Sequence, residues 1–113
     1  MTYHTYFHPA NSMTELEIWL VEWKQSKHTK NGSCTIQNIP NSSLQLETKY
    51  VQTALTFLRI FRARCLILTC LFQTIPIRMT ISLQTGQVIV AIPEEHQNIR
   101  HAIAQEFSLR SRQ

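Results

Sequence analysis

The sequence contains no aspartate and only two glycines among its 113 residues. Turns and acid–base sites of globular enzymes draw on these two residue types, so their scarcity argues against catalysis. There is no glycine-rich phosphate loop, and no aspartate that could orient a catalytic histidine or hold magnesium. We therefore expect a non-enzymatic protein without a cofactor. The odd composition also suggests a codon-level constraint, as when a reading frame overlaps an older gene in a compact viral genome.

Cysteine is scarce as well, with Cys34, Cys65 and Cys70 in the whole chain. An odd and sparse set does not indicate a disulfide scaffold and fits a reducing compartment. We therefore expect an intracellular protein, in the cytoplasm or nucleus of a host cell. The spacing of the cysteines and of the five histidines fits no tetrahedral zinc pattern well, so no metal site is predicted.

A long uninterrupted hydrophobic run is also missing. The most apolar stretch, LTFLRIFRARCLILTCLF at 55–72, is interrupted by Arg59, Arg62 and Arg64. A membrane-spanning helix needs about 20 residues with few charges. Each arginine near its centre would cost about 2.5–3.5 kcal/mol of insertion free energy. The sequence therefore predicts no membrane span.

The positive charge is concentrated in the second half of the chain. Residues 1–50 hold four lysines and four glutamates, whereas residues 51–113 hold seven arginines and three glutamates. The net charge of +4 therefore belongs to the second range and is carried by arginine. The guanidinium group forms bidentate hydrogen bonds with phosphates and carboxylates. We therefore expect an anionic partner for residues 51–113.

Residues 12–28 have the pattern of an amphipathic helix. Ser12 with Glu15, or Thr14 with Glu17, has the spacing of a capping box, and an Asn-Gly turn follows at 31–32. One stripe of the helix is apolar and carries both tryptophans of the chain: Leu16, Trp19, Leu20 and Trp23. The sequence thus predicts a helix that buries one side.

The remaining periodicities predict two short strands, a helix, three strands and a final helix. Their expected positions are 33–39 and 43–48, a helix from about Glu47, strands at 65–72, 77–83 and 87–92, and a helix that opens at Pro93. This order predicts an α+β fold with helices packed on one face of a small, mostly antiparallel sheet. We expect a single domain over 1–113, with a flexible head at 1–11 and a flexible basic tail at 108–113. Such a small chain is expected to form a homodimer.

Two hypotheses follow for function. In the first, RNA phosphates are bound by arginines around the sheet and the helix end, while two tryptophans stack on bases. These residues are Arg59, Arg62, Arg64 and Arg78, with Trp19 and Trp23. The alternative for the tryptophans is a core position, which is the commoner place for tryptophans four residues apart beside leucines. In the second hypothesis, Ile18 and Val21 form a further apolar side of the first helix that binds a host protein, without nucleic acid.

In outline, a helix with a tryptophan pair, then strand and helix, then strands and a C-terminal helix resembles the tombusvirus silencing suppressors. That family binds short duplex RNA as a dimer. Trp19 and Trp23 correspond to its tryptophan pair, although the spacing differs. The resemblance implies an RNA-binding viral accessory protein that suppresses host defence, and we carry this forward as an expectation beside the protein-binding alternative.

Overall fold

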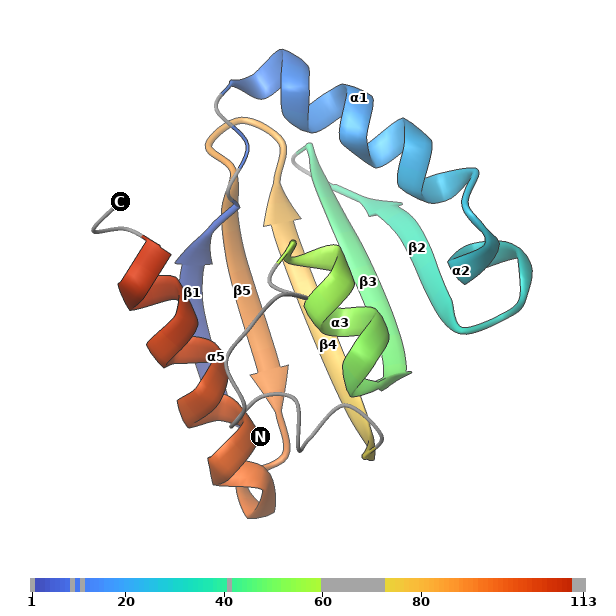
Figure 1. The fold of residues 1–113 in the computed structure, drawn as a ribbon. Coiled ribbons are helices and arrows are strands. Elements are labelled where there is room, and N and C mark those ends of the chain that lie inside the picture. Colours follow the sequence, from blue (N-terminus) through green and yellow to red (C-terminus); the bar gives the residue numbers. More distant parts are fainter. Residues whose placement is uncertain (1, 9, 11, 41, 60–72, 111–113) are drawn as a thin grey trace.

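The computed structural model describes residues 2–8, 10, 12–40, 42–59 and 73–110. Five strands form one antiparallel sheet in the order β1-β5-β4-β3-β2 (Figure 1). The strands are β1 (Thr2–Phe7), β2 (Cys34–Ile39), β3 (Ser43–Tyr50), β4 (Thr74–Ser82) and β5 (Gln87–Ile92). The helices are α1 (Met13–Lys24), α2 (Lys27–Lys30), α3 (Val51–Phe57) and α5 (Gln97–Arg110), with a 3₁₀ turn, η1 (Glu94–His96), before α5. The α+β fold and the antiparallel sheet are confirmed.

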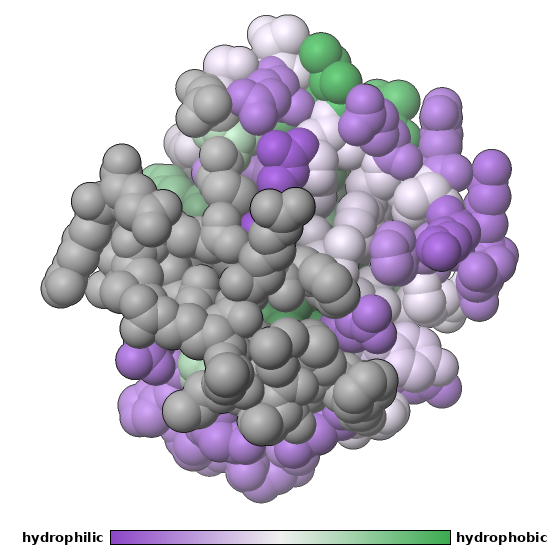
Figure 2. Space-filling view, in the orientation of Figure 1, coloured by the Kyte–Doolittle hydropathy of each residue, from purple (hydrophilic) through white to green (hydrophobic). Residues whose placement is uncertain are grey.

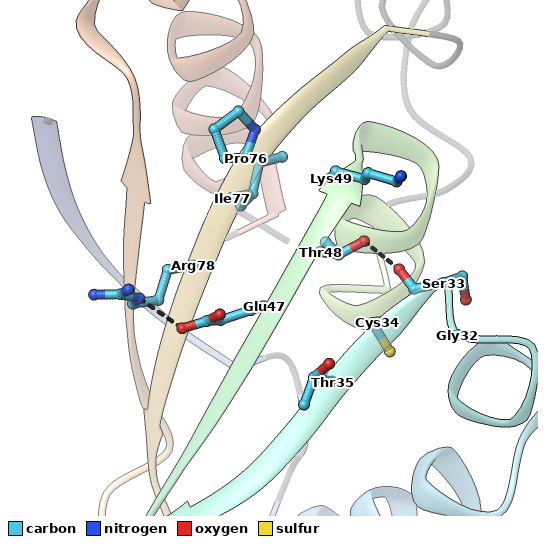
Figure 3. Close-up of a pocket in the computed structure, with 10 residues that line it drawn as sticks. All are labelled: Gly32, Ser33, Cys34, Thr35, Glu47, Thr48, Lys49, Pro76, Ile77 and Arg78. Atoms are coloured by element: carbon cyan, nitrogen blue, oxygen red, sulfur yellow. Dashed lines mark hydrogen bonds and ion pairs between the residues drawn. The ribbon is translucent and has the colours of Figure 1, made fainter.

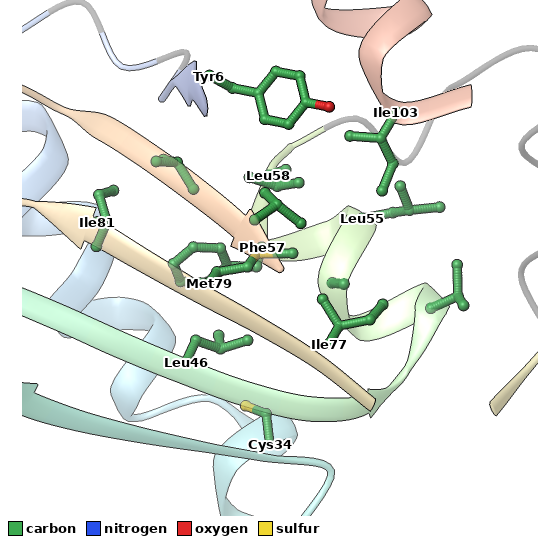
Figure 4. Packing of buried hydrophobic residues seen from close by; sticks show 14 of the residues in the cluster. Tyr6, Cys34, Leu46, Leu55, Phe57, Leu58, Ile77, Met79, Ile81 and Ile103 are labelled. Carbon is green, nitrogen blue, oxygen red and sulfur yellow. The ribbon is translucent and has the colours of Figure 1, made fainter. Parts of the chain in front are cut away.

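The sheet buries one face, as the alternation of β4 predicts. Ile75, Ile77 and Met79 are almost fully buried, whereas Pro76 and Arg78 between them are exposed. Helices α1, α3 and α5 add their own apolar stripes to the same core (Figure 4). Their buried residues include Leu16, Leu20, Ala54, Leu55, Phe57, Ile99, Ala102 and Ile103. Full burial of each large aliphatic side chain contributes about 1.5–3 kcal/mol, so this layer supplies most of the stability.

The helical N-terminus at Ser12 is confirmed. The Ser12 hydroxyl accepts a hydrogen bond from the Glu15 N–H at 3.1 Å, and Ser12 itself is extended. The stripe predicted for this helix is buried along its length. Local sequence signals therefore fix both the start of α1 and the side that it buries.

The hairpin between β4 and β5 is also confirmed, and one glycine shapes its turn. Gly86 adopts the left-handed region at φ +74°, and its N–H donates to the Ser82 carbonyl at 2.8 Å. The Gly86 carbonyl accepts a hydrogen bond from the His8 N–H at 2.8 Å. This turn therefore also holds the chain that leaves β1.

Strand β1 was not expected, because residues 1–11 were interpreted as a head outside the sheet. It pairs with β5 over its whole length, from Thr2 opposite Ile92 to Phe7 opposite Gln87. Its apolar residues do not alternate regularly, so they give no strand period. The partner strand lies some eighty residues later in the chain, and only that distant pairing makes this segment a strand.

The boundary between β3 and α3 lies later than expected. A helix from about Glu47 was predicted, but β3 continues to Tyr50, which pairs with Thr74 across a register shift. The shift lies close to Pro76, which has no N–H to donate to a neighbouring strand. Helix α3 then begins at Val51 and ends at Phe57. The strand predicted at 65–72 lies outside the described residues.

None of the described helices is both long and apolar enough to cross a membrane.

Candidate functional site

The sheet surface opposite the helices, here called the open sheet face, is covered by no described element. Its described side chains include Thr5, Phe7, Thr35, Gln37, Gln45, Glu47, Lys49, Arg78, Thr80, Ser82, Gln87 and Ile89. Hydroxyl and amide groups dominate this surface. This agrees with the polar face predicted from Arg78, Thr80 and Ser82.

Arg78 lies near the centre of the open sheet face and is paired. Its Nε donates to Glu47 Oε1 at 3.1 Å, and both side chains are about half exposed. Gln45 Nε2 also donates to Glu47 Oε1, at 2.6 Å. Because an exposed ion pair contributes only about 0–1 kcal/mol, the pair can open readily toward a ligand.

A hollow of about 320 Å³ lies at one end of this face (Figure 3). It is lined by the turn at Gly32 and Ser33 and by residues of β2, β3 and β4, including Glu47, Lys49 and Arg78. Two cations and one carboxylate line it, so its charge is only weakly positive. The hollow offers both cationic and anionic side chains to a ligand. Its net positive charge is too small to favour a chain of phosphates.

Arg59 lies on the other side of the sheet, at the end of α3. Its Nη1 lies 3.4 Å from Glu15 Oε1, and its guanidinium group stands 5.2 Å from the centre of the Trp19 ring. Its backbone is left-handed at φ +58°, which costs an L residue about 1–2 kcal/mol. Contacts to α1 thus hold Arg59 in place, on the helix side.

The single arginine surface proposed from the sequence is therefore not formed by its described members. Arg59 packs against α1 on the helix side, whereas Arg78 lies on the open sheet face. Arg62 and Arg64 lie outside the described residues. A ligand on one face of the sheet cannot contact Arg59 and Arg78 together without wrapping around the sheet.

Trp19 and Trp23 are buried in the core, which is the alternative that the sequence left open beside RNA stacking. Trp19 is 8% exposed and Trp23 6% exposed. Their rings stack on one another at 5.6 Å, and the Phe57 ring meets both edge-on. His28 stacks on Trp23 at 4.7 Å with nearly parallel planes. These contacts occupy the ring faces that a base would need.

Ile18 and Val21 are exposed, as the second apolar side of α1 requires. Their exposed fractions are 56% and 55%, and they lie one helical turn apart. In Figure 2 hydrophobic atoms gather over α1 at the upper rim of the molecule. Beside Val21 the surface is hollowed to about 270 Å³, with an apolar floor and a polar rim. The floor includes Leu20, Leu44 and Leu83, and the rim Glu17, Lys24 and Asn38.

His8 is buried between β1 and the helices, and no pattern in the sequence predicts its burial. Its ring lies 4.4 Å from that of Trp19, and its Nδ1 accepts a hydrogen bond from the Ala10 N–H at 3.2 Å. Its Nε2 is buried and has no hydrogen-bond partner among the described residues. Burial, and after it the positive charge of Arg59, lower the pKa of His8 to about 4, against weaker opposition from Glu15 and the Phe57 backbone.

The described residues offer no metal site and no activated thiol. No three histidine, cysteine or glutamate side chains of the described ranges come close enough to hold a metal ion. Burial raises the pKa of the Cys34 thiol, and the indole of Trp23 lowers it by less. A raised pKa keeps the thiol protonated and unreactive, so Cys34 acts as a core residue.

No protein-family model matches the chain, and no curated protein or solved structure matches it. The outline resemblance to tombusvirus silencing suppressors therefore stays an expectation. The surfaces described above carry the functional argument.

Proposed function

We propose that this protein is a non-enzymatic binding module that docks onto another protein through the outer side of α1. The observation that carries the proposal is the exposure of Ile18 and Val21, side by side on the helix surface away from the sheet. Exposed apolar pairs of this kind mark interaction sites when polar groups surround them. Glu17 and Lys24 supply such groups here.

Besides the exposed side chains of Ile18 and Val21, this surface contains the hollow beside Val21. Its floor is Leu20, Leu44 and Leu83, so an apolar side chain of the partner would be buried there. The rim offers the carboxylate of Glu17 and the ammonium group of Lys24, which would orient polar groups of the partner. An amphipathic segment of another protein fits both features.

The test compares partners bound by the wild type with those bound by the double variant Ile18→Ser/Val21→Ser. Each buried apolar anchor is worth about 2 kcal/mol or more in such interfaces, so loss of both should lower the affinity for a purified partner by about 800-fold or more. Gln87→Ala, an exposed change on the open sheet face and away from α1, serves as the control and should leave the affinity unchanged. If the double variant keeps every partner at wild-type affinity, the docking surface lies elsewhere.

RNA binding is a second candidate, and one observation on the open sheet face favours it. Phe7 is 66% exposed on that face, where an aromatic ring can stack on a base. Arg78 and Lys49 on the same face can contact phosphates. This version of the hypothesis replaces Trp19 and Trp23 by Phe7 as the stacking residue.

The RNA candidate is tested by measuring affinity for a short RNA at about 50 and about 200 mM salt. Few phosphate contacts give a shallow salt dependence, while stacking contributes about 1–3 kcal/mol per base. Phe7→Ala should then weaken binding at both salts, and Arg78→Ala should flatten the salt dependence. Equal affinity for wild type and Phe7→Ala would remove the open sheet face as the RNA site.

A further inference from the structure

Strand β2 lies at the edge of the sheet and lacks the features that normally keep edges unpaired. It contains no charged residue and no proline, and it pairs with β3 without a register shift from Cys34 to Ile39. Natural edge strands carry lysine, proline or a bulge because a regular edge pairs with other chains. No described backbone group outside β3 forms a hydrogen bond with β2. As far as the described residues go, its outer edge therefore keeps backbone groups that another strand can pair with.

The alternation of β2 restricts how a second copy of this strand could pair with it. Thr35 and Gln37 lie on the open sheet face, and Cys34 and Ile36 lie on the helix side. In an antiparallel pair, opposite residues point to the same face of the sheet. A twofold pairing that keeps both open faces together must therefore be centred on one residue.

The pairing can be centred on Gln37 or on Ile36, and the position of Pro40 favours Ile36. Centring on Gln37 would place Pro40 opposite Cys34, and proline has no N–H to donate. Centring on Ile36 keeps the pairing within 33–39 and places Ile36 of one copy opposite Ile36 of the other. Ile36 is partly exposed at present, so this contact would bury apolar surface on both copies.

We propose that two copies of this chain join through antiparallel β2 strands centred on Ile36, which makes one continuous sheet. Thr35 then lies opposite Gln37 of the other copy, and Cys34 opposite Asn38, so no like charges meet along the strand. The Asn38 amide is already held by Lys24 Nζ, at 3.2 Å. The pairing uses the strand edge and not the outer side of α1, so it does not depend on the proposed function.

The experiment uses charge pairs at two exposed positions that face one another across the dimer axis. Thr35→Lys/Gln37→Lys places like charges opposite each other, and the matched variant Thr35→Lys/Gln37→Glu places opposite charges there. Sedimentation or light scattering compares the mass with that of one chain, 13.2 kDa. We expect the wild type at twice that mass, and a dimer dissociation constant at least about tenfold higher for the like-charge variant than for the opposite-charge variant.

The thermal midpoint of both variants shows that each remains folded, since both positions are exposed. A wild type that keeps the mass of one chain up to about 100 µM overturns the proposal. A dimer with equal dissociation constants for the two variants overturns the pairing of these strands. As a second test, Ile36→Lys and Ile36→Glu should each be monomeric alone and should form a dimer when mixed. Failure of the mixture to associate, while both variants are folded, counts against the Ile36 centre.

Discussion

Acid should destabilise this protein through one buried histidine. His8 is 6% exposed, and its pKa is lowered from 6.5 to about 4. Between these values the unfolded chain binds a proton at this position and the folded chain does not. The free energy of unfolding therefore falls as the pH drops below about 6.5, and the loss is complete below about 4.

The size of the loss follows from the shift. A difference of about 2.5 pKa units corresponds to about 3 kcal/mol, at 1.36 kcal/mol per unit. Domains of this size have free energies of unfolding of about 5–15 kcal/mol, so this loss is a large fraction of the total. The groups that face the ring are Arg59, which opposes its protonation, and Glu15, which favours it.

Urea unfolding at pH 7, 5.5 and 4 measures the effect for wild type and for His8→Asn. The asparagine loses the ring contact with Trp19 and starts less stable, but it cannot titrate. The wild type should therefore lose about 3 kcal/mol more than His8→Asn between pH 7 and pH 4. His101→Asn, at an exposed position, is the control and should follow the wild type. Parallel curves for wild type and His8→Asn would refute the reasoning.

Three further substitutions test the fold by urea unfolding. Trp23→Ala should cost about 3–5 kcal/mol, because it empties the centre of the aromatic cluster. A loss below about 1 kcal/mol would mean that the ring is exposed in solution. Ser12→Ala should cost about 1 kcal/mol through loss of the α1 cap, whereas exposed Thr14→Ala should cost less than about 0.5 kcal/mol. Gly86→Ala and Gly32→Ala should each cost about 1 kcal/mol or more, because both glycines are left-handed and the Cβ added at Gly86 would meet only the flexible end of Met13, at the ordinary contact distance of 3.4 Å. A cost at Gly86 more than about 1 kcal/mol above that at Gly32 would show that the Met13 contact carries strain.

Where the pattern is local, the sequence predicted the structure. The hairpin of β4 and β5 has clean alternation on β4 and a turn signal before β5, and α1 has a cap and an apolar stripe. Strand β1 could not be predicted in this way, because its pairing with β5 depends on chain segments far apart. The β3–α3 boundary was predicted too early for a similar reason. Strand β3 continues through Lys49 to Tyr50 because Tyr50 pairs with Thr74 of β4, more than twenty residues later.

The candidate site was harder to predict, because the side of the sheet is a tertiary property. Arg59 and Arg78 look equivalent in the sequence, yet the fold places them on opposite sides. An apolar stripe with Trp19 and Trp23 favours a core position but also allows a stacking platform, and in the structure both rings pack against Phe57 in the core. Only Ile18 and Val21 lie where the helical period alone puts them.

The position of the positive charge decides how the RNA hypothesis can survive. The open sheet face carries Arg78 and Lys49, but Glu47 offsets one of them. Such a surface gives a salt slope close to one released counterion, because each phosphate contact contributes about 0.9 to the slope. A steep measured slope would therefore exclude the open sheet face as the main site. The main phosphate contacts would then come from Arg62 and Arg64, which lie outside the described residues. In that case the double variant Arg62→Ala/Arg64→Ala should lower the salt slope by about two.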